Sequence, residues 1–188
     1  MKKQWRMVTI VGVAVILTAA GSPSRHIQHD ELRKDNGRVL LITEIDRKPS
    51  MDGDIITSEL ARRLVAGGAS VTQLSELKEK DRIKIRGAVA VITEKDKKIF
   101  KSFPFTCVIK GEFSTNTLAP FNGLYVSEAR GTLKATDTAN GKTTALANIP
   151  AVRGFGNSQV QANRTALDSL AKELPQDFID QVVKRTLN

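Results

Sequence analysis

The sequence has few of the residue types on which catalytic and metal sites most often depend. It contains one cysteine, two histidines, one tyrosine and one tryptophan among 188 residues. A single cysteine excludes an intramolecular disulfide. Cys107 stands in the apolar run Phe105–Ile109, so we expect a buried and unreactive thiol. The only tryptophan lies within residues 1–20, which leaves little aromatic surface for stacking bases, and nucleic-acid binding is not expected.

The two histidines do not fit a catalytic or metal-binding pattern. His26 and His29 precede Asp30 and Glu31 in a polar stretch with no apolar period. Zinc needs ligands held on a rigid scaffold, so an incidental polar segment is the favoured interpretation. No Gly-x-Ser-x-Gly elbow occurs, and no other histidine is present to activate a nucleophile. We therefore expect a protein that is not an enzyme and uses no cofactor or metal.

No apolar run reaches the roughly 20 residues that a membrane-spanning helix needs, but a shorter one follows the N-terminus. Three basic residues within 1–6 precede the uncharged, mostly apolar segment 7–20, which ends in small residues. This order is typical of a cleavable secretory signal peptide over residues 1–20 and predicts a periplasmic protein. The alternative is an inner-membrane anchor through residues 7–20. Gly21 stands where a lipoprotein would carry cysteine, so no lipid anchor is expected.

The chain remains basic once this segment is set aside. Residues 1–20 hold three of the 29 basic residues and none of the 20 acidic ones, which leaves 26 against 20 and a net charge of +6. Such a charge suits anionic lipid, an outer-membrane surface or an acidic protein partner. The polar segment 21–37 is predicted to be a flexible tether, followed by one domain over residues 38–188.

From residue 38 onward, the pattern predicts a mixed-sheet α/β sandwich. It consists of a strand-helix-strand unit, an antiparallel meander and a long C-terminal helix. Val39–Ile45 is a predicted strand buried on both faces. A helix is expected over 55–65 and a second, parallel strand over 69–74. We favour a helix for most of 75–101.

The meander is predicted from three strands over residues 105–115, 125–137 and 143–152. Asn122-Gly123 is a strong signal for the first hairpin turn, and residues 138–142 form the second turn. Antiparallel neighbours joined by such short connections need no crossover, so these strands are expected to lie side by side in sequence order.

The C-terminal helix is predicted to follow a tight glycine-rich turn over residues 153–157. Ser158 is placed to cap the first turn, with Gln161 completing a capping box. Pro175 predicts a kink or short break after Leu174. The apolar residues that recur every three or four positions are expected to form the buried stripe: Val160, Leu167, Leu170, Ala171, Leu174, Phe178, Val182 and Leu187.

Three short motifs occur in this same order. They are Val108–Glu112, Thr136–Lys142, and Gly154–Ser158 running into Ala166-Leu167. In these features residues 38–187 resemble CsgG-like and TolB N-terminal-like periplasmic domains, together with FlgT and the lipoprotein activators of penicillin-binding proteins. That family shows I-x-G-E, then D-T-x-T-G, then a glycine-rich turn into an alanine- and leucine-rich helix. The resemblance implies a non-lipidated periplasmic scaffold that docks other envelope proteins.

The leading hypothesis is a non-enzymatic periplasmic adaptor or assembly factor of flagellar, secretion or cell-wall machinery. It would act by contact with an envelope protein complex, and it could also form a homo-oligomer. Such contact is expected at sheet edges and basic loops, because an edge strand can accept a partner strand. Lys110, Arg130, Lys134 and Arg153 are the basic residues expected nearest those edges.

The alternative is a binding module for a small anionic or lipid ligand. Its site would be the turn that contains Gly154, Gly156 and Ser158, because exposed N–H groups at the start of a helix attract anions. Arg153 would add a positive charge beside them. A hydrolase with an unrecognised site is a third and weaker alternative.

The predicted signal peptide has a direct test. The chain recovered from the periplasm of a bacterium that expresses the full gene is expected to begin at Gly21, because signal peptidase cuts after small residues. Intact-mass measurement of the fractionated protein reads the new N-terminus. A full-length chain in the inner-membrane fraction would instead establish the anchor through residues 7–20.

Overall fold

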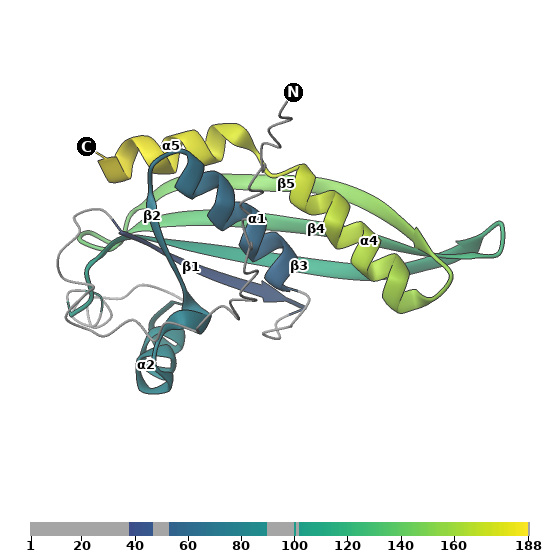
Figure 1. The fold of residues 1–188 in the computed structure, drawn as a ribbon, viewed down its shortest axis with the longest axis horizontal. Coiled ribbons are helices and arrows are strands. Elements are labelled where there is room, and N and C mark those ends of the chain that lie inside the picture. The colour runs from purple at the N-terminus through teal and green to yellow at the C-terminus, as the bar shows by residue number, and fades with distance from the viewer. Residues whose placement is uncertain (1–37, 47–52, 90–99, 101, 188) are drawn as a thin grey trace, which may run out of the picture.

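The computed structural model describes residues 38–46, 53–89, 100 and 102–187. They form a mixed sheet of five strands in the order β2-β1-β3-β4-β5 (Figure 1). The elements are β1 (Arg38–Ile45), α1 (Gly53–Ala66), β2 (Ser70–Gln73), the short 3-10 helix η2 (Leu74–Glu76), α2 (Glu79–Val89), β3 (Phe105–Phe121), β4 (Leu124–Asp137), β5 (Thr143–Gly156), α4 (Gln159–Lys172) and α5 (Gln176–Leu187). The predicted fold class is therefore confirmed. Some predictions fall on residues outside the described ranges. These are the signal peptide over 1–20, the tether over 21–37, and residues 90–99 of the segment 75–101, for which we favoured a helix.

The strand-helix-strand unit forms as predicted. β1 pairs in parallel with β2 on one side and with β3 on the other, so it lies inside the sheet. Val39 and Leu41 point into one hydrophobic cluster, and Leu40 and Ile42 point into a second cluster on the opposite face. Burial on both faces explains the unbroken apolar run that first marked this strand.

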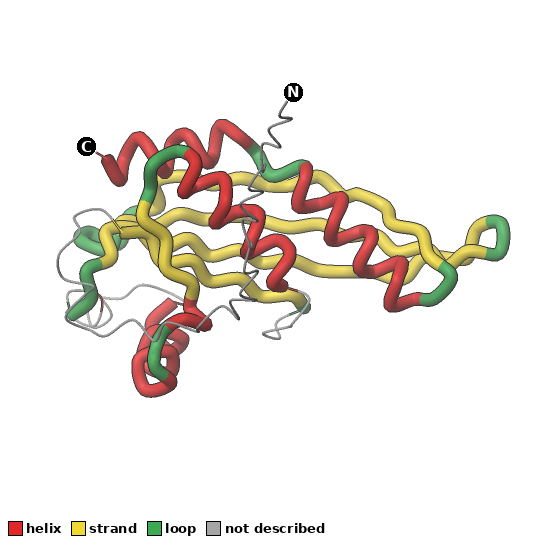
Figure 2. The backbone as a smooth tube through the Cα atoms, viewed as in Figure 1, coloured by secondary structure: helices red, strands yellow, loops and turns green. Residues whose placement is uncertain are grey.

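β3 and β4 form a hairpin that is longer than predicted. β3 continues six residues beyond the expected Thr115, to Phe121. Asn122 and Gly123 have φ angles of 49° and 78°, as the predicted two-residue turn requires. The end of this hairpin projects beyond the end of β5 and beyond α4 (Figure 2).

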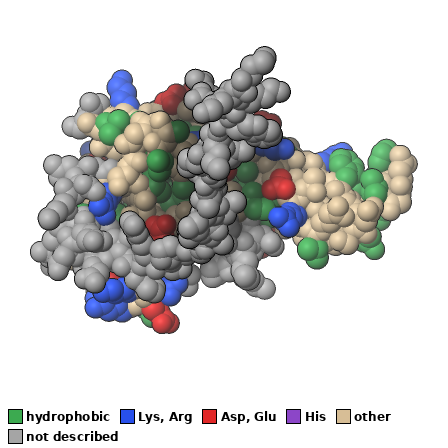
Figure 3. Space-filling model, in the orientation of Figure 1, with side chains coloured by type: hydrophobic (Ala, Val, Ile, Leu, Met, Phe, Trp, Pro, Cys, Tyr) green, Lys and Arg blue, Asp and Glu red, His purple; other side chains and the backbone are tan. Residues whose placement is uncertain are grey.

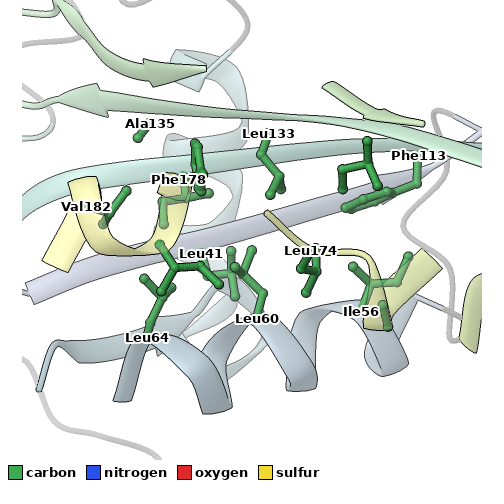
Figure 4. Close-up of a cluster of buried hydrophobic side chains, with 14 of the residues drawn as sticks. Leu41, Ile56, Leu60, Leu64, Phe113, Leu133, Ala135, Leu174, Phe178 and Val182 are labelled. Carbon is green, nitrogen blue, oxygen red and sulfur yellow. The ribbon is translucent and has the colours of Figure 1, made fainter. Parts of the chain in front are cut away.

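Three helices cover one face of the sheet. Leu60 and Leu64 of α1, Leu167 and Leu170 of α4 and Phe178 of α5 are all at most 2% exposed. They pack against strand residues that include Leu41, Ile109 and Leu133, and Figure 4 shows part of this cluster. Burial of such side chains contributes about 1.5–3 kcal/mol each, so this layer is a major source of stability.

The predicted break in the C-terminal helix is confirmed, since α4 ends at Lys172 and α5 begins at Gln176. Arg63 of α1 stabilises this junction. Its guanidinium donates to the carbonyl oxygens of Leu174 at 2.9 Å and Lys172 at 3.0 Å. These carbonyls lack helical partners, so the arginine both caps α4 and joins it to α1. Glu59 holds Arg63 in place through an ion pair of 2.7 Å.

Two members of the predicted buried stripe were assigned wrongly. Val160 is 77% exposed and Leu187 is 61% exposed, and each lies in a terminal turn of its helix. Ala162 and Ala166 of α4 are fully buried in their place. These small side chains let α4 approach the sheet closely.

The predicted glycine-rich turn is also corrected, because residues 153–156 belong to β5 and the chain turns only at Asn157-Ser158. Gly154 and Gly156 face α4. A Cβ at Gly154 would lie 2.1 Å from the backbone nitrogen of Ala166 and 2.4 Å from the carbonyl oxygen of Ala162. At Gly156 the nearest atom, at 2.7 Å, would be the backbone nitrogen of Ala162. The two glycines therefore allow backbone contact between β5 and α4.

The described residues cover the opposite face of the sheet only in part. Leu77, Ile85 of α2, Phe100 and Phe103 pack on Leu40, Ile42, Phe105 and Val108, which lie in β1 and at the start of β3. In Figure 1 α2 lies away from the three other helices, below the β1 side of the sheet. We call the remainder of this side, over β3, β4 and β5, the open face.

The contact between β5 and α4 can be tested by Gly154→Ala. The added methyl group meets backbone atoms that cannot rotate away, so α4 must shift, and the free energy of unfolding is expected to fall by about 2–3 kcal/mol. Gly67→Ala is the matched control. There the new Cβ meets Cγ2 of Val183 at 2.7 Å, which belongs to a partly exposed side chain and not to the backbone, so a smaller loss is expected. Urea unfolding measures both, and equal losses would contradict the packing role of Gly154.

Candidate functional site

The open face is built by the alternation of side chains along three antiparallel strands. From Cys107 onward, odd-numbered residues of β3 and β4 face the three helices and even-numbered ones face the other way. Register then aligns open-face residues in rows across the strands. One row joins Lys110, Lys134 and Leu146, and the next joins Glu112, Thr132 and Asn148. This face is polar and charged where the helix-covered face is apolar.

The four basic residues selected from the sequence all lie on this face. Lys110 belongs to β3, Arg130 and Lys134 belong to β4, and Arg153 belongs to β5. The expectation that they stand at sheet edges is wrong for the first three, because β3 and β4 are interior strands. Only Arg153 is on an edge strand. The sheet therefore joins these residues by their shared face and not by a shared edge.

Lys110 is held by two carboxylates. Its ammonium group lies 2.6 Å from Oε1 of Glu112 and 3.7 Å from Oε2 of Glu44. Partial burial by itself would lower the pKa of Lys110, but the hydrogen bond and charge of Glu112, together with the charge of Glu44, outweigh it and raise that pKa above its usual value. Lys110 therefore stays charged at neutral pH and cancels much of the negative charge around it.

The other three basic side chains are exposed. Arg130 donates from Nε to the hydroxyl of Ser114 at 3.3 Å, a contact that leaves its positive charge unneutralised. Within the described part of the chain, Lys134 and Arg153 have no ion pair. The positive charge available to a partner thus comes from Arg130, Lys134 and Arg153.

An open depression of about 870 Å³ lies on this face. Its polar lining combines both signs of charge: Glu44, Asp46, Lys110, Glu112, Ser114, Arg130, Thr132 and Asn148. Asp46 is turned toward β3, where its carboxylate accepts from the backbone N–H and the hydroxyl of Thr115 at 3.2 and 3.1 Å. The depression offers both donors and acceptors, and its lining among the described residues includes no histidine or thiol.

The open face changes character toward the end of the β3–β4 hairpin. There a row of apolar side chains, Leu118, Val126 and Phe155, replaces the charged rows. Phe121 at the turn is 62% exposed, and Tyr125, which pairs with Gly156 and points to the opposite side of the hairpin, is 46% exposed. Sequence reasoning missed this apolar end. Its signal was present in residues 113–127, which contain no charged side chain in a chain that is 26% charged.

The expected ligand site at Gly154, Gly156 and Ser158 is occupied by the protein itself. α4 fills the space above both glycines, as described above. The hydroxyl of Ser158 accepts from the N–H of Gln161 at 3.2 Å, which confirms the predicted cap. The Gln161 side chain accepts from the N–H of Asn157 at 2.9 Å, one residue before the position of a standard capping box. The geometry gives this alternative no support.

The remaining reactive groups are held in structural roles. Cys107 is 6% exposed, and burial raises the pKa of its thiol to about 12. Arg185 of α5 forms an ion pair of 3.1 Å with Asp137 at the end of β4.

No group of three or more potential metal ligands occurs in the described ranges, and His26 and His29 lie outside them. Among the helices of the described residues, none has the length and apolar content to cross a bilayer.

Comparison with known proteins identifies no family. No family model matches the chain, and no curated protein matches its sequence. The lipoprotein GNA1162 from Neisseria meningitidis is similar at 17% identity and a TM-score of 0.47, over 65% of this chain and 85% of that chain. The PelC dodecamer from Paraburkholderia phytofirmans is similar at 17% identity and a TM-score of 0.44, over 78% of this chain and 86% of that chain. A minor lipoprotein from Acinetobacter baumannii is similar at 12% identity and a TM-score of 0.38, over 80% of this chain and 93% of that chain. Likenesses of this strength do not establish a shared function.

The buried thiol leads to a reactivity prediction. At pH 8 the native protein is expected to react with a thiol reagent far more slowly than after unfolding in guanidinium, because a pKa near 12 leaves almost no thiolate and the side chain is enclosed. With an aromatic disulfide as the thiol reagent, the absorbance of the aromatic thiolate that it releases measures both rates. Rapid reaction of the native protein would show that Cys107 is accessible and would reopen the question of a nucleophile.

Proposed function

We propose that the protein is a non-enzymatic adaptor or assembly factor of the bacterial envelope, of the CsgG/TolB-like type, and that it binds a partner protein through its open face. The observation that carries this proposal is the unequal covering of the sheet. One face is buried beneath α1, α4 and α5, whereas over β3–β5 the other presents exposed charged side chains. The envelope location rests on the predicted export signal and on the motifs shared with that family.

The chemistry of the open face favours a protein partner. In the lining of the depression, Glu44 and Glu112 lie among the basic side chains of Lys110 and Arg130. Thr132 and Asn148 add neutral donors and acceptors. A nucleic-acid surface would carry an excess of positive charge to neutralise phosphates. Mixed charge with neutral hydrogen-bonding groups is typical of a specific protein interface, in which complementary charge fixes the orientation of the partner.

The free charges define what the partner should carry. Lys110 is already paired with two carboxylates, so it adds little to the attraction. Arg130, Lys134 and Arg153 are exposed and lack a neutralising carboxylate in the described part of the chain. We therefore infer a partner with acidic side chains that face β4 and β5. A non-enzymatic role accords with a buried, unreactive Cys107.

The proposal is tested by reversing two of these charges. In the Lys134→Glu/Arg153→Glu variant, recovery of the partner after in-cell crosslinking and affinity purification is expected to fall at least tenfold, because two attractive contacts become repulsive. Raising the salt concentration during purification should weaken the wild-type complex as well. Mass spectrometry identifies and quantifies the recovered partners.

A control variant must change charge without touching the open face. Lys142→Glu does so, because Lys142 is exposed in the turn between β4 and β5. It should recover the partner as the wild type does, and both variants should keep the wild-type melting temperature. If the open-face variant and the control recover partners equally, the open face is not the binding surface. If no partner is recovered from the wild type, the adaptor role itself fails.

A further inference from the structure

We propose that the projecting end of the β3–β4 hairpin seats on a membrane surface that contains anionic phospholipid. This hairpin tip consists of residues 118–126 with Phe155 of β5. The proposal shares Arg153 with the partner surface on the open face, but it is tested separately, because it rests on the apolar rows at the other end of the sheet and requires no second protein.

The first observation is where the exposed aromatic residues lie. The described part of the chain contains all seven phenylalanines and the only tyrosine. Five of these eight side chains are buried, at most 6% exposed. The other three, Phe121, Tyr125 and Phe155, are 62%, 46% and 44% exposed and all belong to the hairpin tip. Tyrosine, which is apolar with a polar hydroxyl, concentrates where protein meets the lipid head groups, and exposed phenylalanine can enter the boundary between head groups and acyl chains.

The second observation is the shape and charge of this end. The turn end of the tip extends past α4 and the end of β5, and Figure 3 shows hydrophobic side chains gathered on the projecting lobe. Residues 113–127 contain no Asp, Glu, Lys or Arg. Because no charged group has to be desolvated, the tip can enter the boundary between head groups and acyl chains at little cost. Val160, exposed in the first turn of α4, adds apolar surface at the same end.

The third observation is a single cation behind the apolar surface. A hollow of about 390 Å³ is lined by Leu118, Ala119, Pro120, Phe121, Val126, Phe155 and Arg153. Arg153 is its one charged side chain. An amphiphile with an acyl chain and one anionic head group has the matching chemistry, because the phosphate can meet the guanidinium while the apolar part contacts the aromatic rings.

Charge complementarity favours lipid over a second copy of the chain at this surface. Two tips placed together would bring two Arg153 side chains close to each other in an apolar contact, since Glu128, the cross-strand neighbour of Arg153, is not part of the lining of the hollow. A phospholipid surface provides a phosphate for each arginine. The convex, narrow tip also inserts readily between head groups, whereas a stable protein interface needs about 800 Å² from each partner.

Vesicle sedimentation tests this proposal with the chain that begins at Gly21, since the described core lies within residues 38–187. The wild type is expected to sediment with vesicles of phosphatidylglycerol and phosphatidylcholine, and less with phosphatidylcholine alone. Phe121→Ser should weaken the partition coefficient about tenfold, because one aromatic side chain no longer enters the apolar boundary. Arg153→Gln should weaken it about fivefold, and only on anionic vesicles.

Two matched controls separate the tip from general surface effects. Leu146→Ser removes a 66%-exposed apolar side chain from the charged region of the open face, and Lys134→Gln removes an exposed cation there. Both should bind vesicles as the wild type does. A positional readout comes from Phe121→Trp, because the chain without residues 1–20 has no other tryptophan. Its emission should shift to the blue with anionic vesicles.

Three outcomes would overturn the proposal. The first is a wild type that does not sediment with anionic vesicles. The second is equal binding by Phe121→Ser and Leu146→Ser. The third is concentration-dependent dimerisation, measured by analytical ultracentrifugation and abolished by Phe121→Ser, with no shift of the tryptophan emission on vesicles; this would assign the tip to a second copy. None of these outcomes bears on partner recovery by the open face, so the two proposals fail separately.

Discussion

The close backbone contact between α4 and β5 is the constraint on which the layout of the domain depends. Gly154 and Gly156 leave room for Ala162 and Ala166, so the helix lies directly on the edge strand. Arg63 then ties the end of α4 to α1 through the carbonyls of Leu174 and Lys172. Three helices are thereby drawn to one face, and in the described part of the chain no helix covers the other face over β4, β5 and the later part of β3.

One periodicity produces both the core and the candidate surfaces. Because side chains alternate along a strand, Ile109 and Leu133 enter the core while their neighbours Lys110 and Lys134 point to the open face. Along the hairpin the exposed rows pass from charged to apolar, and they end at Phe121 beyond the reach of the helices. Arg153 lies at the boundary between the two regions. The two proposals together place a membrane contact and a protein contact on the same rigid hairpin.

The candidate site was predictable in its residues but not in its geometry. Lys110, Arg130, Lys134 and Arg153 were selected as basic residues of the meander, and the structure assembles them on one face. Their relation to the sheet edges was wrong for Lys110, Arg130 and Lys134. Pairing with β1 places β3 in the interior, and pairing with β3 and β5 does the same for β4. The hairpin tip was missed since Leu118, Phe121 and Tyr125 look like core residues when only hydrophobicity is considered.

The sequence by itself determined the local elements, because each depends on nearby residues. Asn122-Gly123 specified the hairpin turn, Ser158 the helix start, and Pro175 the break between α4 and α5. Only the tertiary structure decided which apolar residues are covered, as Val160 and Phe121 show by their exposure. It also decided what Gly154 and Gly156 do. A glycine suits a turn and a tight helix contact equally well in sequence, and the choice depends on α4, which packs on them from across the fold.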